Sequence, residues 1–183
     1  MQQVSNSDTD SAGMFTKTLM LTRPAASIKS RLLVGAVALS LGAAFPAWAA
    51  LGGDIASVQS DQIHMQGSLR TTVTGSYTVH EIQSAAGTVV REYVSTSGKS
   101  AGKVFAIGWQ GPWPPDIRQV LGSYFDQYVQ AAKAQRAARV GRRPLVIEEP
   151  GLVMQVGGHP RGFVGRAYVP EMLPAGVRAE DIQ

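Results

Sequence analysis

The sequence predicts an α+β domain behind an N-terminal signal peptide: an antiparallel sheet, made of a three-strand meander plus a C-terminal hairpin, with one long helix packed on it. Three observations lead to this fold class. Segments rich in β-branched and aromatic residues alternate with short glycine-containing connections. One stripe of apolar residues recurs at spacings of three and four over four turns. The N-terminal segment is basic between residues 17 and 31, then apolar, and then rich in small residues.

The signal peptide is predicted from the order of its parts. Four basic residues precede the uncharged apolar run at 32–45, and Ala47 and Ala49 stand at the small positions that a signal peptidase reads. The run of 14 residues is shorter than the roughly 20 that span a bilayer, which favours a cleaved leader over a transmembrane anchor. Cleavage is therefore expected after Ala49.

Export would place the mature protein in the periplasm or outside the cell. Because the first 13 residues are polar and acidic, translation from Met14 or Met20 would give a more ordinary leader than residues 1–49. The remaining residues 50–183 suit a single domain.

Composition excludes several classes of chemistry. The chain has no cysteine, so thiol nucleophiles, cysteine-bound zinc and iron–sulfur clusters are excluded. Without the leader's four basic and two acidic residues, the totals of 17 and 13 become 13 and 11, a formal charge of +2. Such a balance argues against nucleic acid as a partner.

The mature chain is expected to begin with a short helix at 54–67, capped by Asp54 or Ser57 and ended by Gly67. The connections that follow are too short for parallel crossovers, so the next strands should form antiparallel hairpins. These strands are predicted at 72–83, 88–95 and 103–110.

The third strand alternates by size. Large side chains (Phe105, Ile107, Trp109) should face one way and smaller ones (Val104, Ala106, Gly108) the other. The face of small residues would let another element approach closely. The following helix is the obvious candidate, although the sequence does not assign it a face.

The long helix is predicted from an apolar stripe between Ile117 and Ala132. Pro115 suits the first helical position, Asp116 suits the positive end of the helix dipole, and Gly141 is a natural stop.

The run GWQGPWPPD, residues 108–116, joins strand to helix and has two interpretations. As a structural elbow, its glycine permits the turn and its prolines end the ladder and preset the helix, with the Trp113 ring filling the gap beneath the corner. As a ligand platform, it would present an exposed tryptophan pair. The elbow is favoured, with Trp109, Trp113, Pro114 and Pro115 as its residues.

Beyond the helix, one short strand and then a hairpin are expected. The hairpin strands at 152–156 and 162–169 flank the turn GGHPR, and residues 170–183 form a loose tail.

The chemistry-bearing residues form no recognisable motif. His64, His80 and His159 are scattered, Ser123 lies within the helix rather than on a G-x-S-x-G turn, and no carboxylates stand out as a matched acid and base. No catalytic residue, metal ligand or cofactor is therefore predicted. A site built from residues distant in sequence stays open.

Five cations cluster at the predicted end of the long helix. They either complement the negative end of the helix dipole, the favoured interpretation, or form a patch for an anionic envelope surface or an envelope protein. The cluster comprises Lys133, Arg136, Arg139, Arg142 and Arg143.

The mature chain resembles a family of exported Gram-negative bacterial proteins known only as a domain of unknown function. The runs ALGGD, YTVHEIQSAAGTVVREYVS, GKVFAIGWQGPWPPDIRQVLGSYFDQY and GLVMQVGGHPRGFVGRAYVPEMLPAGV carry the resemblance. It implies a small secreted or periplasmic accessory protein and brings no catalytic residues. We expect a non-catalytic binding or assembly module of the cell envelope; the alternative is a small exported hydrolase.

Overall fold

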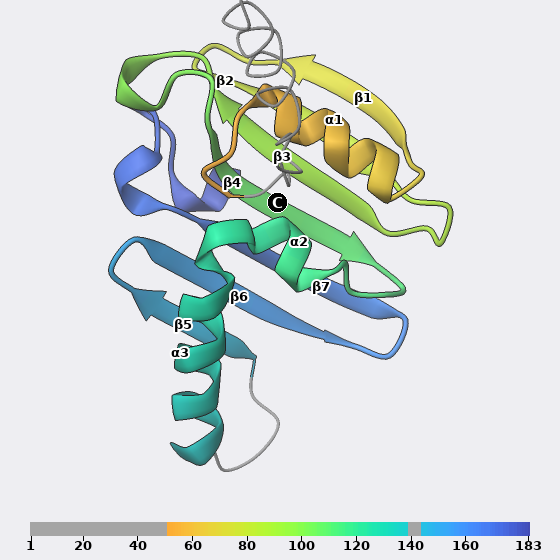
Figure 1. Ribbon diagram of the computed structural model, residues 1–183, viewed down its shortest axis with the longest axis vertical. Coiled ribbons are helices and arrows are strands. Elements are labelled where there is room, and N and C mark those ends of the chain that lie inside the picture. Colours follow the sequence, from red (N-terminus) through yellow and green to blue (C-terminus); the bar gives the residue numbers. More distant parts are fainter. Residues whose placement is uncertain (1–50, 139–143) are drawn as a thin grey trace, which may run out of the picture. The chain divides into compact units, whose positions relative to one another are not determined.

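The computed structural model describes residues 51–138 and 144–183, which form an antiparallel sheet with helices packed on it (Figure 1). The seven strands lie in the order β1-β2-β3-β4-β7-β6-β5. The predicted α+β class is confirmed. The strands are β1 (Ser68–Val73), β2 (Tyr77–Gln83), β3 (Val89–Ser95), β4 (Val104–Gly111), β5 (Leu145–Glu149), β6 (Leu152–His159) and β7 (Gly162–Tyr168).

The meander has four strands rather than three. The segment predicted as one strand at 72–83 contains a turn, because the backbone N–H and hydroxyl of Thr74 both donate to the carbonyl oxygen of Tyr77, at 2.9 and 2.7 Å. The chain reverses there, and β1 becomes an edge strand. The C-terminal hairpin of β6 and β7 joins the meander through β7, which pairs with β4.

Three helices follow from local sequence signals. Asp54 caps α1 (Ile55–His64) by accepting from the backbone N–H groups of the first turn. The predicted long helix consists of α2 (Ile117–Leu121), a 3₁₀ turn (Gly122–Tyr124) and α3 (Phe125–Ala138). Gly122 has a φ of +50°, which a glycine adopts without strain, and the axis changes direction there (Figure 1).

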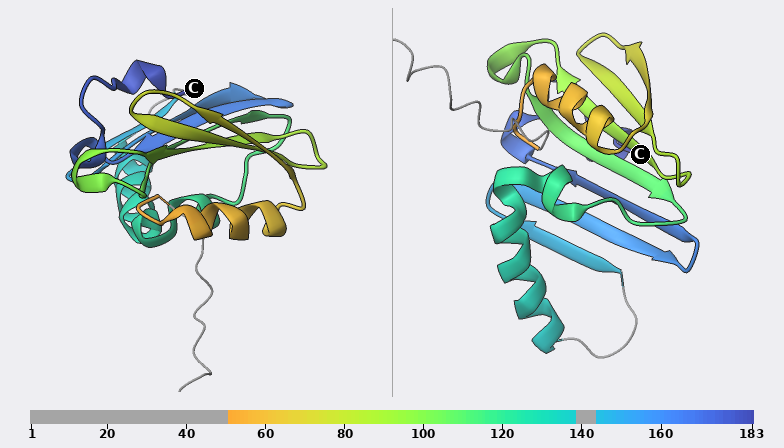
Figure 2. Two further views of the ribbon diagram at one scale, coloured as in Figure 1. Left: turned by 90° about the horizontal axis from the view of Figure 1, so that it is seen from above. Right: turned by 45° about the vertical axis from the view of Figure 1, so that its right-hand side comes forward.

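The two faces of the sheet are covered differently. The three helices lie against one face, hereafter the helical face, and the segment after β7 lies against the other (Figure 2). We call residues 170–183 the tail and the side they cover the tail face. The tail is not loose as expected, because Ile182 is only 1% exposed and packs with Tyr93, Phe105 and Ala106.

A β-bulge in β4 changes the predicted alternation. Tyr93 pairs with Ala106 but Val94 pairs with Val104, so Phe105 is the extra residue. Val104 therefore joins Ile107 in the core of the helical face, whereas Phe105 packs on the tail face. The predicted placement of Val104 and Phe105 was wrong, because a bulge shifts the alternation by one residue.

Candidate functional site

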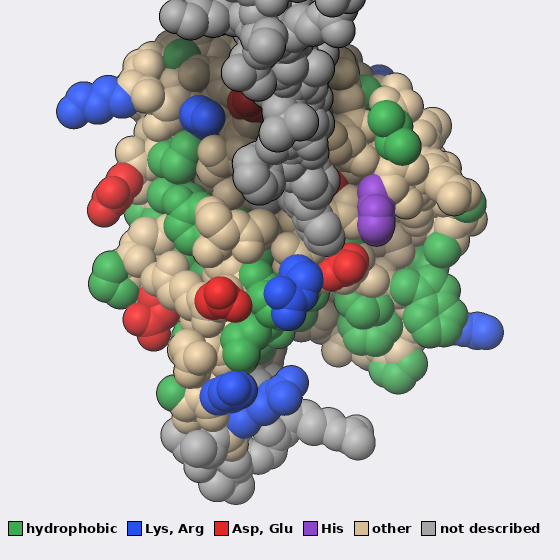
Figure 3. Space-filling model, viewed as in Figure 1, with side chains coloured by type: hydrophobic (Ala, Val, Ile, Leu, Met, Phe, Trp, Pro, Cys, Tyr) green, Lys and Arg blue, Asp and Glu red, His purple; other side chains and the backbone are tan. Residues whose placement is uncertain are grey.

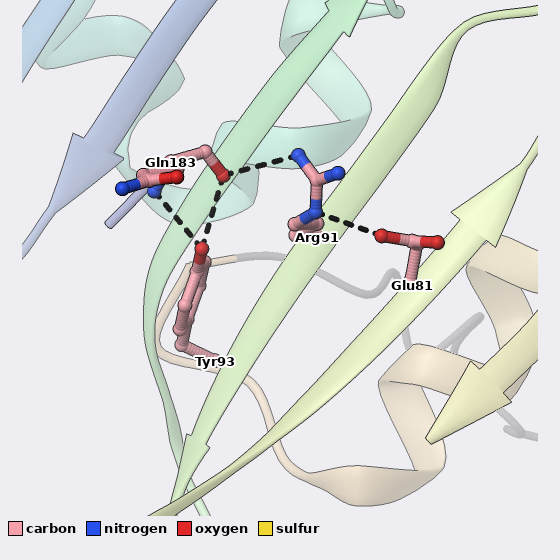
Figure 4. Close-up of polar contacts among 4 residues, drawn as sticks. All are labelled: Glu81, Arg91, Tyr93 and Gln183. Atoms are coloured by element: carbon pink, nitrogen blue, oxygen red, sulfur yellow. Dashed lines mark hydrogen bonds and ion pairs between the residues drawn. The ribbon is translucent and has the colours of Figure 1, made fainter. Parts of the chain in front are cut away.

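The end of the tail is held on the sheet by its main chain (Figure 4). The Tyr93 hydroxyl donates to the carbonyl oxygen of Gln183 at 3.0 Å and accepts from the backbone N–H of the same residue at 3.0 Å. Arg91 also donates to that carbonyl at 3.4 Å, while its Nε pairs with Glu81 at 2.8 Å. These contacts would suit any residue at position 183.

A second arginine holds the preceding residues of the tail. Arg166 of β7 donates to the carbonyl oxygens of Ala179 at 2.7 Å and Ile182 at 3.3 Å, and its Nε donates to Gln155 at 3.1 Å. Gly108 leaves space for the end of the tail, because a Cβ at that position would collide with the carbonyl of Gln183. The small residues of β4 do admit a close neighbour, but it is the tail rather than the expected helix.

Two grooves flank the tail. The first, the valine groove, holds about 470 Å³ over β4, β7, β6 and β5. The second, the arginine groove, holds about 460 Å³ over β1, β2 and β3. The valine groove is lined by Val146, Val164, Gln110, Gln155 and Arg166, among others. The arginine groove is lined by Arg70, Arg91, Glu81, Tyr77 and Tyr93, among others.

The helical face contains a buried pair of carboxyl groups. Asp61 of α1 is 2% exposed and Glu92 of β3 is 0% exposed. Glu92 lies between the inward-facing Val90 and Val94, and Gln119 of α2 donates its amide N–H to Asp61 Oδ1. Residues from two helices and one strand therefore meet at this pair.

The remaining oxygens of the pair lack an ordinary donor. Within the described residues, Asp61 Oδ2 and both Oε atoms of Glu92 meet no other N–H or O–H group. Two ionised carboxylates can only accept hydrogen bonds, so their proximity favours a proton on Glu92, with Asp61 as the acceptor. Burial raises the pKa of Asp61 to about 6, even though hydrogen bonds from Glu92 and Gln119 lower it. Burial and the charge of Asp61 raise the pKa of Glu92 well above its ordinary value.

His80 borders this pair. It is the cross-strand partner of Glu92, and its Nδ1 lies 3.1 Å from the hydroxyl of Thr71. Burial lowers the pKa of His80, which favours the neutral imidazole.

A smaller pocket of about 170 Å³ lies where α1, the β4–α2 loop and the β2–β3 turn meet; we call it the Trp113 pocket. His64, Met65 and Gln119 contribute to its lining. Trp113 is 61% exposed, so the expectation that its ring fills the corner was wrong. Hydrophobic side chains gather over this loop in Figure 3. The corner is held instead by the main chain, since Thr88 Oγ1 donates to the carbonyl of Trp113 at 2.7 Å.

The other residues of the predicted elbow lie in different environments. Trp109 is fully buried in the core of the helical face, Pro114 is exposed, and Pro115 is half-buried. Pro115 precedes Asp116, which caps α2 by accepting from the backbone N–H groups of Arg118 and Gln119. An exposed tryptophan pair, which the platform interpretation required, is not formed.

The predicted cation patch is only partly described. Lys133 and Arg136 are exposed on α3, where Lys and Arg side chains gather in Figure 3. Arg139, Arg142 and Arg143 lie outside the described residues, as does the predicted signal peptide.

His159 lies exposed at the end of β6, away from the buried His80 of β2. In the described part of the chain, no three His, Asp or Glu side chains converge as a metal site would require. No helix there has the length and apolar character needed to cross a membrane.

The carboxyl pair was missed by sequence reasoning, although a signal existed. Glu92 occupies an inward position in the alternation Val90, Glu92, Val94, and Asp61 follows the buried Val58 by three positions on α1. An acid at an apolar position of both patterns indicates a buried carboxyl. The pairing itself needed the packing of α1 on β3.

Comparisons with known proteins give a family and no closer relative. No curated protein and no solved structure matches the chain. The family model described as "Protein of unknown function (DUF2844)" matches residues 47–182, and the chain therefore belongs to this family.

Proposed function

We propose that this protein is a non-catalytic binding or assembly module of the bacterial cell envelope, and that it binds an extended polypeptide segment on its tail face. The observation that carries the proposal is the pair of grooves beside the tail, of about 470 and 460 Å³. They border a surface that already holds a strip of polypeptide through main-chain contacts.

The valine groove has the chemistry that a peptide requires. Val146 of the edge strand β5 and Val164 of the inner strand β7 are 37% and 49% exposed, and both offer apolar area to a side chain. The amides of Gln110 and Gln155 border them and can pair with peptide N–H and C=O groups. Apolar contacts with a few polar groups are typical of binding grooves.

The hydrolase alternative finds less support. Asp61 and Glu92 are the carboxyl pair that a hydrolytic site would need, but with 2% and 0% exposure neither can reach a substrate while the helices are in place. A proton held between two buried groups fits a structural role better.

A crosslinking experiment tests the binding surface. A photoreactive p-benzoylphenylalanine replaces Val164 in the valine groove or, as the matched control, Ile63, which is 76% exposed on α1. After illumination of an exporting Gram-negative host, adducts should form at position 164 and not at position 63. Equal adducts at both positions, or none at 164, would refute the tail face as the binding surface.

Export is the second part of the proposal. Residues 1–49 carry the basic, apolar and small-residue order of a signal peptide. Protein recovered from the periplasm or the medium should have the intact mass of a chain that starts at Ala50. A recovered mass that retains residues 32–45 would contradict cleavage.

A further inference from the structure

Helix α1 is weakly anchored to the sheet. Its buried side chains are Ser57, Val58 and Asp61, while Ile55 and Ile63 are 47% and 76% exposed. One valine supplies most of the apolar contact of the helix with the core. The carboxyl group of Asp61 is therefore a large part of what joins α1 to the rest of the domain.

The chain on both sides of α1 is fixed more firmly. Leu51 is 1% exposed and donates its N–H to the carbonyl of Val120, and Gly52 and Gly53 exchange backbone hydrogen bonds with Val104. After the helix, β1 pairs with β2 along its length. Because both ends are tethered, α1 can move away locally without unfolding the sheet.

We propose that α1 is docked on the sheet through a proton shared by Asp61 and Glu92, and that loss of this proton releases α1 from the helical face. Two ionised carboxylates without a donor between them repel each other, and no ion pair among the described residues compensates either of them. Opening α1 hydrates both groups and removes that penalty.

The charged and polar groups around Asp61 and Glu92 influence whether these two carboxyl groups are ionised. From α1, the charge of His64 favours the ionised form of Asp61. From α2, Gln119 is neutral and donates to Asp61. From β2, His80 faces the same side as Glu92, whereas Glu81 and Arg91 face the tail side, where they line the arginine groove.

The direction in which pH changes the docking of α1 follows from the pKa values of these groups. Both carboxyl pKa values are raised in the docked state, so the stabilisation is complete below the ordinary values of 3.8 and 4.5. It declines as the pH rises through about 6 for Asp61 and continues to decline toward the higher pKa of Glu92. The lowered pKa of His80 has the opposite effect, but only below its ordinary value of 6.5. Above pH 6.5, the carboxyl pair alone among these groups makes the docking of α1 depend on pH.

Release of α1 would also change the Trp113 pocket. His64 and Met65, at the end of α1, form part of its wall, and Gln119 joins this wall to Asp61. The pocket is therefore complete only while α1 is docked.

Hydrogen exchange of the full chain between pH 6.5 and 9 tests the proposal. After correction for the intrinsic exchange rate, protection of the α1 amides should fall by up to about tenfold per pH unit until Glu92 is ionised. Protection in β4 should stay level over the same range. Equal losses in α1 and β4, or no loss in α1, would overturn the proposal.

Two substitutions and one control make the test specific. Glu92→Gln keeps a donor for Asp61 and removes one charge, so the decline of α1 protection above pH 6.5 should disappear. Asp61→Asn should move the decline to lower pH without removing it, because it removes the charge of Asp61 but leaves Glu92 buried. Glu148→Gln, on an exposed residue of β5, should behave like the unmodified protein. An unchanged decline in Glu92→Gln would refute the role of the pair.

A measurement on the unmodified protein keeps the proposal testable if both variants fail to fold. Infrared spectroscopy should show the carbonyl band of a protonated carboxyl group at pH 7, where ordinary Asp and Glu side chains are ionised. Absence of that band would mean that no shared proton exists.

Discussion

The helical face and the tail face belong to the same seven strands but are packed by different means. On the helical face, large side chains such as Trp109, Leu121 and Met154 are fully buried beneath the helices. On the tail face, a narrow strip of chain is held through main-chain carbonyls, and valines and arginines beside it remain partly exposed. Packing of side chains supplies stability on the first face, while the second leaves room for a ligand.

This difference has an energetic consequence. Burial of apolar side chains contributes about 25 cal/mol for each Å² removed from water, whereas a hydrogen bond to a main-chain carbonyl contributes about 0.5 to 1.5 kcal/mol net. Changes on the helical face should therefore reduce the stability of the whole domain. Changes on the tail face should mainly alter the tail and the grooves.

The largest effect is expected for Trp109→Ala. The ring is fully buried in the core of the helical face, and its removal should lower the free energy of unfolding by about 3 to 5 kcal/mol. Trp113→Ala is the matched control, and since that ring is 61% exposed, the change should stay within about 0.5 kcal/mol. Urea unfolding measures both. Similar costs for the two substitutions would contradict the assignment of Trp113 to the surface.

Two glycines at neighbouring positions of the sheet provide a smaller and sharper comparison. A Cβ at Gly165 would collide with the ring of Trp109, which the core holds in place, while a Cβ at Gly108 would collide only with the end of the tail. Overpacking costs about 1 to 3 kcal/mol. Gly165→Ala should lie at the upper end of this range and Gly108→Ala at the lower end.

Hydrogen exchange distinguishes the two glycine variants further. Gly108→Ala should increase exchange at the end of the tail and leave β4 protected, because the tail can move away from the new methyl group. Gly165→Ala should reduce protection across the sheet. The reverse order of stability would mean that the tail is the more rigid of the two neighbours.

Local patterns predicted the elements that have a buried face of their own. The strands around Val90 and Ile107 and the start of α2 at its Asp116 cap follow directly from alternation and capping. Strand β1 was missed, because all its residues except Leu69 are exposed and its sequence lacks an apolar alternation. Residues 68–71 were assigned to no element, and residues 72 and 73 were read as the start of the following strand. An edge strand is specified by its partner more than by its own residues.

The rest of the candidate site depends on contacts between distant segments. The attachment of the tail requires Arg166 and Tyr93, from different strands, to donate hydrogen bonds to the carbonyl oxygens of residues 179, 182 and 183. The carboxyl pair requires α1 to pack on β3. Neither arrangement has a motif of fixed spacing, so the sequence indicated at most that Asp61 and Glu92 occupy inward positions of their own elements.

The bulge at Phe105 determines which changes in chain length β4 can accommodate. Residues 104 and 107 face the helices although three positions separate them, because the extra residue between them is absorbed on the tail face. Deletion of Phe105 would leave Val104 and Ile107 two positions apart and therefore still on the helical face, with one aromatic side chain fewer on the tail face. Insertion of one residue between Ile107 and Trp109 would instead turn one of these two side chains away from the core. In a comparison of family members, a one-residue deletion within β4 should therefore fall at the bulge, and other insertions and deletions should collect in the turns at 84–88 and 96–103.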